Sequence, residues 1–213
     1  MRLRRRPWIA TAIQDYSDFI VNLNESLVKP DWEALFGRKA SLYVELGTGK
    51  GQFITELARQ NPDRNYVGVE AQHDIIFYAA RKAQEKELAN VKFLLMDANQ
   101  LTEMFQVNSV MGLFINFCDP WPKKRHAKRR LTFHGFFDNY RQVLEKNGLL
   151  SFKTDNRDLF EFSLNEFVNA NVRLQNISLD LHESNMIGNV MTEYETKFSS
   201  MGQPIYRLEA VFS

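Results

Sequence analysis

Short apolar runs of strand length recur along the chain and are separated by amphipathic segments of helix length. The segment GQFITELARQ places apolar residues at 53, 54, 57 and 58, which form one face of a helix. Strands are expected at 41–46, 64–70, 91–97, 111–117 and 148–155. Helices are expected at 51–60, 74–88, 99–105, 131–146 and 157–170, with Asn147-Gly148 capping the fourth.

Two late segments, 172–181 and 204–212, alternate apolar and polar residues as partly exposed strands do. They bring the expected sheet to seven strands. Because strands and helices alternate with short connections, the pattern predicts a doubly wound, mostly parallel α/β sheet with helices on both faces. We expect this domain to span residues 41–213 and to follow a basic, irregular extension at 1–40.

Positive charge is concentrated in two places, although the net charge of the 213-residue chain is only +1. Four arginines lie within residues 2–6, and six lysines or arginines lie within 123–130, directly after the turn DPWP. Local basic runs of this kind favour anionic partners such as nucleic acid. The alternative is a solvated basic face that binds nothing.

Other features narrow the class of protein. The single cysteine, Cys118, allows no intrachain disulfide and suits a reducing compartment, so we expect the cytoplasm. No apolar run of about 18 residues exists, so no membrane span is expected. The four histidines lack metal-ligand spacing, so we expect no metal site. Apolar residues exposed on the late strands could form an interface, so a homodimer is one open alternative for the oligomeric state.

Four carboxylates follow or end the first four predicted strands: Glu45, Glu70, Asp97 and Asp119. The carboxyl ends of parallel strands meet at one edge of a doubly wound sheet, where ligands bind. Four acids at one edge would repel one another unless a ligand uses them. The sequence therefore predicts a ligand site at this edge.

The loop Gly47-Thr48-Gly49-Lys50-Gly51 after the first strand has the form G-x-G-x-G, which permits close approach of a ligand to the backbone. Glu70 lies 23 residues after Gly47, near the spacing of a ribose-binding acid. Glu45, just before the loop, would repel a phosphate and favour a cation. A ligand with ribose, adenine, ammonium and sulfonium groups satisfies these demands, which indicates S-adenosylmethionine.

The motif ELGTGKGQF resembles the first motif of the class I S-adenosylmethionine-dependent methyltransferases. The stretches DPWPKKRHAKRRL, FKTDN and MTEYETKF resemble the bacterial tRNA (guanine-N7)-methyltransferase family. This resemblance covers the chain from Arg2 to Arg207. It implies a Rossmann-like fold and the formation of 7-methylguanosine at guanosine 46 of the tRNA variable loop.

The resemblance also implies roles for individual residues. Glu45 would meet the methionyl ammonium, Glu70 the ribose hydroxyls and Asp97 the adenine, while Gly47 and Gly49 give clearance. Asp119 is expected to be the catalytic residue and also to lie at the cofactor. The substrate positions are Lys123, Asp155, Thr192, Glu193, Tyr194 and Glu195, and the RNA-contact positions are Arg125, His126, Ala127, Lys128, Arg129 and Arg130.

Guanine N7 has an exposed lone pair, so attack on the methyl group needs no prior proton removal. The product ring is positively charged, and a fixed carboxylate beside it would stabilise that charge. We therefore assign Asp119 mainly to orientation and electrostatic stabilisation, with proton acceptance secondary. Trp121 either stacks on a base or packs under the loop, and packing is slightly favoured.

Several alternatives stay open. Thr192-x-x-Glu195 is also a capping box, and Asp155-Asn156 is also a helix cap. The arginine run at 2–6 either contacts tRNA or is a disordered tail. The competing functions are methylation of another RNA, a small molecule or a protein by the same fold, and non-catalytic RNA binding.

Overall fold

The computed structural model describes residues 8–21, 29–184 and 186–212. Within them the chain forms one sheet of eight strands: β1 Ile20–Val21, β2 Leu42–Leu46, β3 Asn65–Glu70, β4 Val91–Leu95, β5 Val110–Asn116, β6 Leu144–Thr154, β7 Arg173–Ser178 and β8 Tyr206–Val211. The α-helices are α1 Ile9–Ala12, α2 Trp32–Phe36, α3 Gln52–Gln60, α4 His73–Glu85, α5 Leu101–Met104, α6 Phe137–Val143, α7 Arg157–Asn169 and α8 Glu193–Ser199. The arginine run at 2–6 lies outside the described residues.

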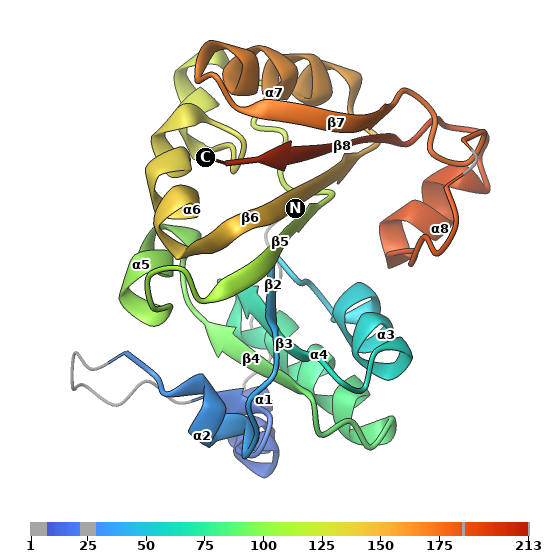
Figure 1. The fold of residues 1–213 in the computed structure, drawn as a ribbon. Helices are drawn as coiled ribbons and strands as arrows, with labels where there is room; N and C mark the ends of the chain where they lie inside the picture. The colour runs from blue at the N-terminus through green and yellow to red at the C-terminus, as the bar shows by residue number, and fades with distance from the viewer. Residues whose placement is uncertain (1–7, 22–28, 185, 213) are drawn as a thin grey trace.

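The strand order is β1-β4-β3-β2-β5-β6-β8-β7. All neighbouring strands pair in parallel except β8, which is antiparallel to both β6 and β7 (Figure 1). From β2 the chain first builds outward through β3 and β4, and then returns to place β5 on the other edge of β2. The order therefore reverses between β2 and β5, which is where a doubly wound sheet binds its ligand.

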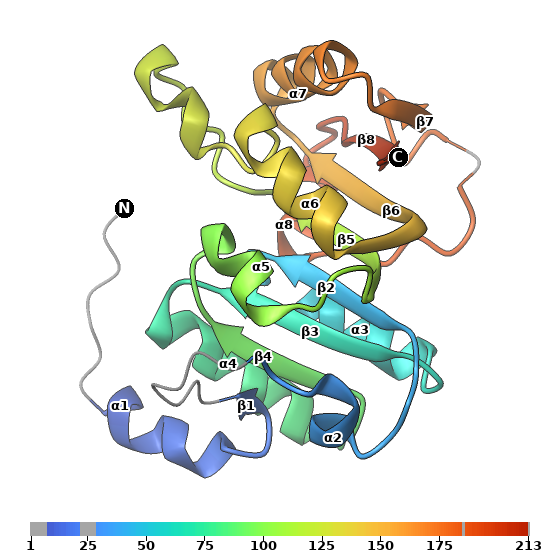
Figure 2. The same ribbon diagram turned by 60° about the vertical axis from the view of Figure 1, so that its left-hand side comes forward.

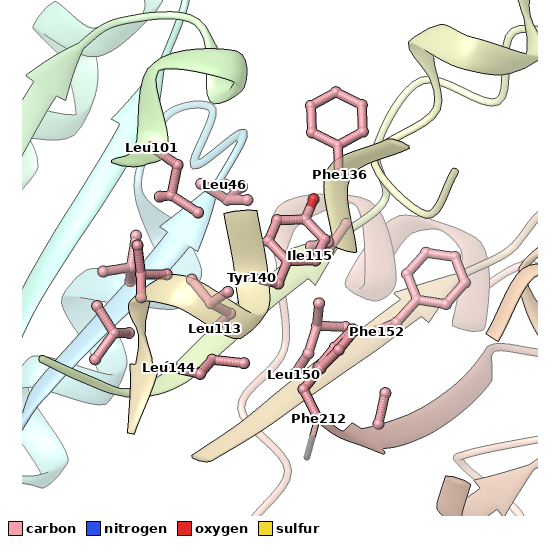
Figure 3. Packing of buried hydrophobic residues seen from close by; sticks show 14 of the residues in the cluster. Leu46, Leu101, Leu113, Ile115, Phe136, Tyr140, Leu144, Leu150, Phe152 and Phe212 are labelled. Carbon is pink, nitrogen blue, oxygen red and sulfur yellow. The ribbon is translucent and has the colours of Figure 1, made fainter. Parts of the chain in front are cut away.

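Helices cover both faces of the sheet, as Figure 2 shows with α5 and α6 in front of the strands and α3 and α4 behind them. Ile54 of α3 and Ile76 of α4 pack with Tyr66 and Phe93 in one cluster of buried residues. The larger cluster joins β2, β5 and β6 to α5 and α6 (Figure 3). It also includes Leu159, Phe160 and Phe167 of α7. Burial of this apolar surface is the main force that holds the layers together.

The predicted α/β class is confirmed, but the expected number of seven strands is wrong. The additional strand, β1, pairs with β4 through Ile20 and Val21. Two residues are too few for an alternating pattern to be recognised in the sequence. Because β1 belongs to the segment 1–40, that segment contributes to the sheet, and the division at residue 40 stays a prediction.

The helix expected at 131–146 is shorter than predicted. It begins with a 3₁₀ turn at His134–Phe136, continues as α6 Phe137–Val143, and gives way to β6 at Leu144. Asn147-Gly148 therefore does not cap it. Asn147 has φ 70°, and the pairing of β6 with β5 shifts register in this region. The dipeptide marks an irregularity inside a strand, where the same left-handed conformation is needed.

No helix among the described residues is long and apolar enough to cross a membrane.

Candidate active site

A cavity of about 620 Å³ lies at the carboxyl ends of β2, β3, β4 and β5. Its size is typical of sites for small ligands. It is lined by Gly47, Gly49, Val69, Glu70, Ala71, Gln72, Ile75, Met96, Asp97, Ala98, Asn99, Phe117, Cys118, Asp119, Trp121, Lys128, Arg129, Leu131, Phe136 and Tyr194. Three of the four predicted acids thus share one cavity with two basic residues, and Glu45 is not among the lining residues.

The glycine loop forms one wall of the cavity. Gly47, Gly49 and Gly51 have φ of 77°, 57° and 77°, a conformation that L side chains rarely adopt. A Cβ atom on Gly47 or Gly49 would meet nothing within 4 Å, whereas one on Gly51 would lie 2.8 Å from the Cβ of Ala79. The first two glycines therefore leave open space beside bare backbone, and the third lets α3 approach α4.

Glu70 connects the end of β3 to the glycine loop. Its carboxylate accepts hydrogen bonds of 3.0 Å from the backbone N–H of Gly49 and 3.0 Å from that of Gln72. Burial raises the pKa of Glu70, and these N–H groups oppose that shift. A carboxylate has about four acceptor positions, so Glu70 keeps capacity to accept from a ribose hydroxyl as well.

Glu45 is buried beneath the loop. It accepts hydrogen bonds of 2.6 Å from Thr48 Oγ1 and 2.9 Å from Asn116 Nδ2. Burial raises the pKa of Glu45 to about 7. Within the described part of the chain, Asn116 Oδ1 is the one buried side-chain acceptor or donor without a partner. Asn116 was missed by the sequence analysis, because its contact with Glu45 spans 71 positions.

Asp97 is exposed at the end of β4 and caps the short 3₁₀ helix Ala98–Gln100. Its Oδ1 accepts from Asn99 N at 2.9 Å and from Asn99 Nδ2 at 2.6 Å. Asp97 therefore has a structural role as well as a place in the cavity wall.

The loop 117–121 has an unusual backbone. Phe117 and Trp121 have φ of 51° and 42°, which bulky residues rarely adopt and which often marks functional sites. Arg130 supports the loop, donating from Nε to Pro120 O and from Nη2 to Trp121 O, both at 3.0 Å. Asp119 is exposed at its centre, and no described side chain hydrogen-bonds to or pairs with its carboxylate.

The basic segment 124–129 forms a 3₁₀ helix beside this loop. The Arg129 guanidinium lies 5.0 Å from the centroid of the Trp121 ring, and His126 contacts the same ring edge-on. Trp121 is partly exposed and faces the cavity, so it is not simply packed under the loop. Lys123 and Arg125 are exposed but do not line the cavity.

The segment 192–195 divides into residues with different environments. Thr192 is buried and caps α8, accepting from Glu195 N at 2.9 Å. Tyr194 is 58% exposed and lines the cavity. Glu195 is fully buried in an ion pair with Lys153, so its carboxylate is turned away from solvent. Lys153 was not predicted as a site residue, although it lies in the stretch FKTDN.

Asp155 lies outside this cavity. It lines a separate depression of about 480 Å³ with Gln203 and Tyr206, at the start of α7. Its neighbour Asn156 caps α7 by accepting from Leu159 N at 2.8 Å. The helix-cap interpretation of Asp155-Asn156 is therefore confirmed for Asn156.

The strand order and the cavity at its reversal define the Rossmann-like fold of class I methyltransferases. A protein-family model described as "Putative methyltransferase" matches residues 39–208. The tRNA (guanine-N(7)-)-methyltransferase of Bacillus subtilis is 48% identical over 98% of this chain and 98% of its own length. That of Streptococcus pneumoniae strain 70585 is 46% identical over 100% of both chains. The chain belongs to the tRNA (guanine-N7)-methyltransferase family.

Solved structures support the fold independently. An antibiotic-related methyltransferase aligns with a TM-score of 0.64 at 18% identity, covering 90% of this chain and 96% of its own. The 16S rRNA methyltransferase KamB aligns with a TM-score of 0.66 at 16% identity, covering 87% and 95%. At this identity the likeness concerns the fold alone.

Proposed function

We propose that this protein transfers the methyl group of S-adenosylmethionine to N7 of a guanine in tRNA, at guanosine 46 of the variable loop. The observation that carries the proposal is a single cavity that combines a glycine loop, the acids Glu70 and Asp119, and the bases Lys128 and Arg129. A nucleoside-type donor and a phosphate-bearing acceptor both find complementary groups there. Full-length similarity to tRNA (guanine-N7)-methyltransferases supports the same reaction.

Glu70 would hold the ribose hydroxyls of the methyl donor, since its carboxylate is already oriented by Gly49 and Gln72. Gly47 and Gly49 provide the open backbone against which the donor packs. Asp97 would lie near the adenine. Glu45, whose carboxyl group Asn116 and Thr48 fix beneath the loop, would ionise and supply negative charge when the methionyl ammonium binds.

When bound, S-adenosylmethionine would supply an electrophilic methyl group to the N7 lone pair, and the electrons of its carbon–sulfur bond would stay on sulfur. The guanine ring gains positive charge in the same step. Asp119, exposed at the cavity on a constrained loop, is the group that would stabilise this charge and orient the base. No proton has to leave before attack, so the main contributions are alignment and electrostatics.

The basic segment would bind the RNA backbone. Lys128 and Arg129 line the cavity, and Arg125, His126 and Ala127 belong to the same 3₁₀ helix. Phosphate contacts of this kind supply affinity and register but little sequence information. Arg130 would act indirectly, because its guanidinium holds the backbone of Pro120 and Trp121.

Of the remaining predicted substrate residues, some would contact tRNA and others would position helix α8. Tyr194 would contact the base, because it is exposed at the cavity. Lys123 and Asp155 would contact tRNA outside the cavity, and Glu193 would act from the exposed side of α8. Thr192 and Glu195 would position α8 rather than touch guanine. The protein would work in the cytoplasm, where tRNA is modified.

The proposal is tested by incubating the protein with unmodified tRNA and methyl-labelled S-adenosylmethionine, followed by nuclease digestion. We expect labelled 7-methylguanosine, and none from tRNA that carries adenosine at position 46. Label in another nucleoside would retain the enzyme class but overturn the assigned base. Donor binding without transfer to any tRNA would overturn the assigned substrate.

A further inference from the structure

Helix α8 is joined to the rest of the protein by two ion pairs, which are made by the residues immediately before and after Tyr194. Glu193 Oε1 lies 2.8 Å from Nζ of Lys82 in α4. Glu195 Oε2 lies 2.6 Å from Nζ of Lys153 in β6. Tyr194, between them, is the residue of α8 that lines the cavity. In Figure 1, α8 lies apart from the other helices at the right of the view.

The two pairs differ in their surroundings. The side chains of Lys82 and Glu193 are 24% and 43% exposed, whereas those of Lys153 and Glu195 are 4% and 0% exposed. Exposed pairs contribute little because water and salt screen them. Removing one member of a buried pair leaves an uncompensated charge, which is strongly unfavourable. The Lys153–Glu195 pair is therefore the dominant polar connection between α8 and the sheet.

Further hydrogen bonds fix the geometry of this buried pair. Lys153 Nζ also donates to Val190 O at 2.9 Å and to Asn189 Oδ1 at 3.2 Å. Glu195 Oε1 accepts from Asn189 Nδ2 at 2.5 Å and faces His182 Nε2 at 3.2 Å. Lys153 thus holds both the helix and the segment that leads into it.

Lys153 is also connected to the loop that carries Asp119. Its backbone carbonyl accepts a hydrogen bond of 2.9 Å from the N–H of Phe117, two residues before Asp119. The Phe117 ring stacks on the Tyr194 ring with centroids 6.3 Å apart. One residue of β6 therefore supports two walls of the cavity, the Asp119 loop through its backbone and Tyr194 through its side chain.

We propose that Lys153 is a positioning residue for methyl transfer, holding α8 through Glu195 so that Tyr194 faces the base beside Asp119. The proposal deepens the function proposed above and rests on it for its kinetic consequences. Its structural part, that the buried pair fixes α8, is independent of the substrate. Replacing a buried pair with apolar side chains often leaves stability unchanged, so positioning is a better reason for the pair than stability.

The test compares Lys153→Met with Lys197→Met, which removes the same charge from an exposed position on α8 itself. Hydrogen exchange of the intact proteins, without tRNA or donor, is measured by peptide. We expect amides of α8 to exchange more than about tenfold faster in Lys153→Met, and to be accelerated more than those of β5, because loss of the pair opens α8 locally. Lys197→Met is expected to match the wild type.

Kinetics then separate positioning from folding. In Lys153→Met we expect kcat for tRNA to fall by about tenfold or more with KM changed by less than about threefold, because misplacement affects alignment and not phosphate contacts. Glu195→Gln, which keeps the side-chain shape, should give the same pattern, and it serves as the second variant if Lys153→Met folds poorly.

Unchanged α8 exchange in both variants would overturn the proposal, as would equal acceleration in every peptide, which would indicate a role in stability alone. Normal kcat despite a loosened α8 would overturn the positioning role. If the wild-type protein does not methylate tRNA, the proposed function fails, and the exchange measurement still decides whether the buried pair fixes α8.

Discussion

The carboxylate of Glu70 accepts a 3.0 Å hydrogen bond from the backbone N–H of Gly49, across 21 positions of the chain. The end of β3 is thereby tied to the glycine loop that follows β2. The same carboxylate lines the cavity, so the residue that shapes the loop is also a candidate ligand of the methyl donor. Loop geometry and donor binding should consequently be lost together when this carboxylate is changed.

We expect Glu70→Ala to weaken binding of S-adenosylhomocysteine by about 10- to 100-fold, since hydrogen bonds to charged groups contribute roughly 1.5–3 kcal/mol each. Glu70→Gln should also weaken it, because an amide NH₂ would face one of the two N–H donors. Isothermal titration calorimetry measures both effects. Glu85→Gln, which changes an exposed carboxylate of α4, is the control. Affinity equal to that of the control would exclude Glu70 from the donor site.

Arg129 and Arg130 are neighbours in the sequence, but replacing each of them should have a different effect on the enzyme. Arg129→Ala is expected to weaken tRNA binding and to lower its salt slope by about one, as loss of one phosphate contact does. Arg130→Ala removes two hydrogen bonds to the Asp119 loop and a contact with the Phe162 ring at 4.2 Å. Its kcat should fall by about tenfold or more, with little change in the salt slope.

Filter binding of tRNA at several salt concentrations, combined with steady-state kinetics, separates these two outcomes. Lys146→Ala is a suitable control, because Lys146 is exposed near the amino-terminal end of β6, whereas the cavity lies at the carboxyl ends of the strands. An Arg130→Ala slope lowered as much as that of Arg129→Ala would place Arg130 in direct contact with RNA.

The gathering of Glu70, Asp97 and Asp119 at one cavity could be predicted because parallel strands share a carboxyl edge. The burial of Glu195 in an ion pair could not be predicted, because nothing in the sequence indicates that Lys153, 42 positions away, is its partner. The role of Arg130 could not be predicted either, since a basic run does not show which of its residues hydrogen-bonds to the Asp119 loop. Periodicity gives the elements, whereas side-chain partners depend on tertiary packing.

The buried Glu45 should make stability depend on pH. Burial raises its pKa from 4.5 to about 7, so between these values the folded protein binds a proton that the unfolded chain releases. The free energy of unfolding therefore falls as pH rises through this window, by about 3 kcal/mol at most from this group. Glu45→Gln should lack this contribution.

Urea denaturation between pH 5 and 8, in the absence of methyl donor, measures the difference between the wild type and Glu45→Gln. The wild type should lose stability relative to the variant as pH rises, and Glu85→Gln should show no such trend against the wild type. A difference that is constant with pH would mean that Glu45 is ionised throughout, despite its burial.

Asp119 provides the most direct test of how the reaction is catalysed. Asp119→Asn keeps the shape and a carbonyl acceptor but removes the charge, whereas Asp119→Ala removes all three. If the carboxylate stabilises positive charge on the guanine ring, both variants should lose kcat by about 100-fold, the size expected for one preorganised electrostatic group. Binding of tRNA should weaken by less than about threefold, since Asp119 offers phosphates no attraction.

Single-turnover rates with saturating tRNA and donor isolate the transfer step from product release. Asp138→Asn, in which an exposed carboxylate with 95% side-chain exposure is changed, is the matched control. Nearly full activity in Asp119→Asn with loss in Asp119→Ala would assign Asp119 to hydrogen bonding of the guanine edge instead of charge stabilisation. Full activity in both variants would remove Asp119 from catalysis and direct attention to Tyr194 and the alignment of the base.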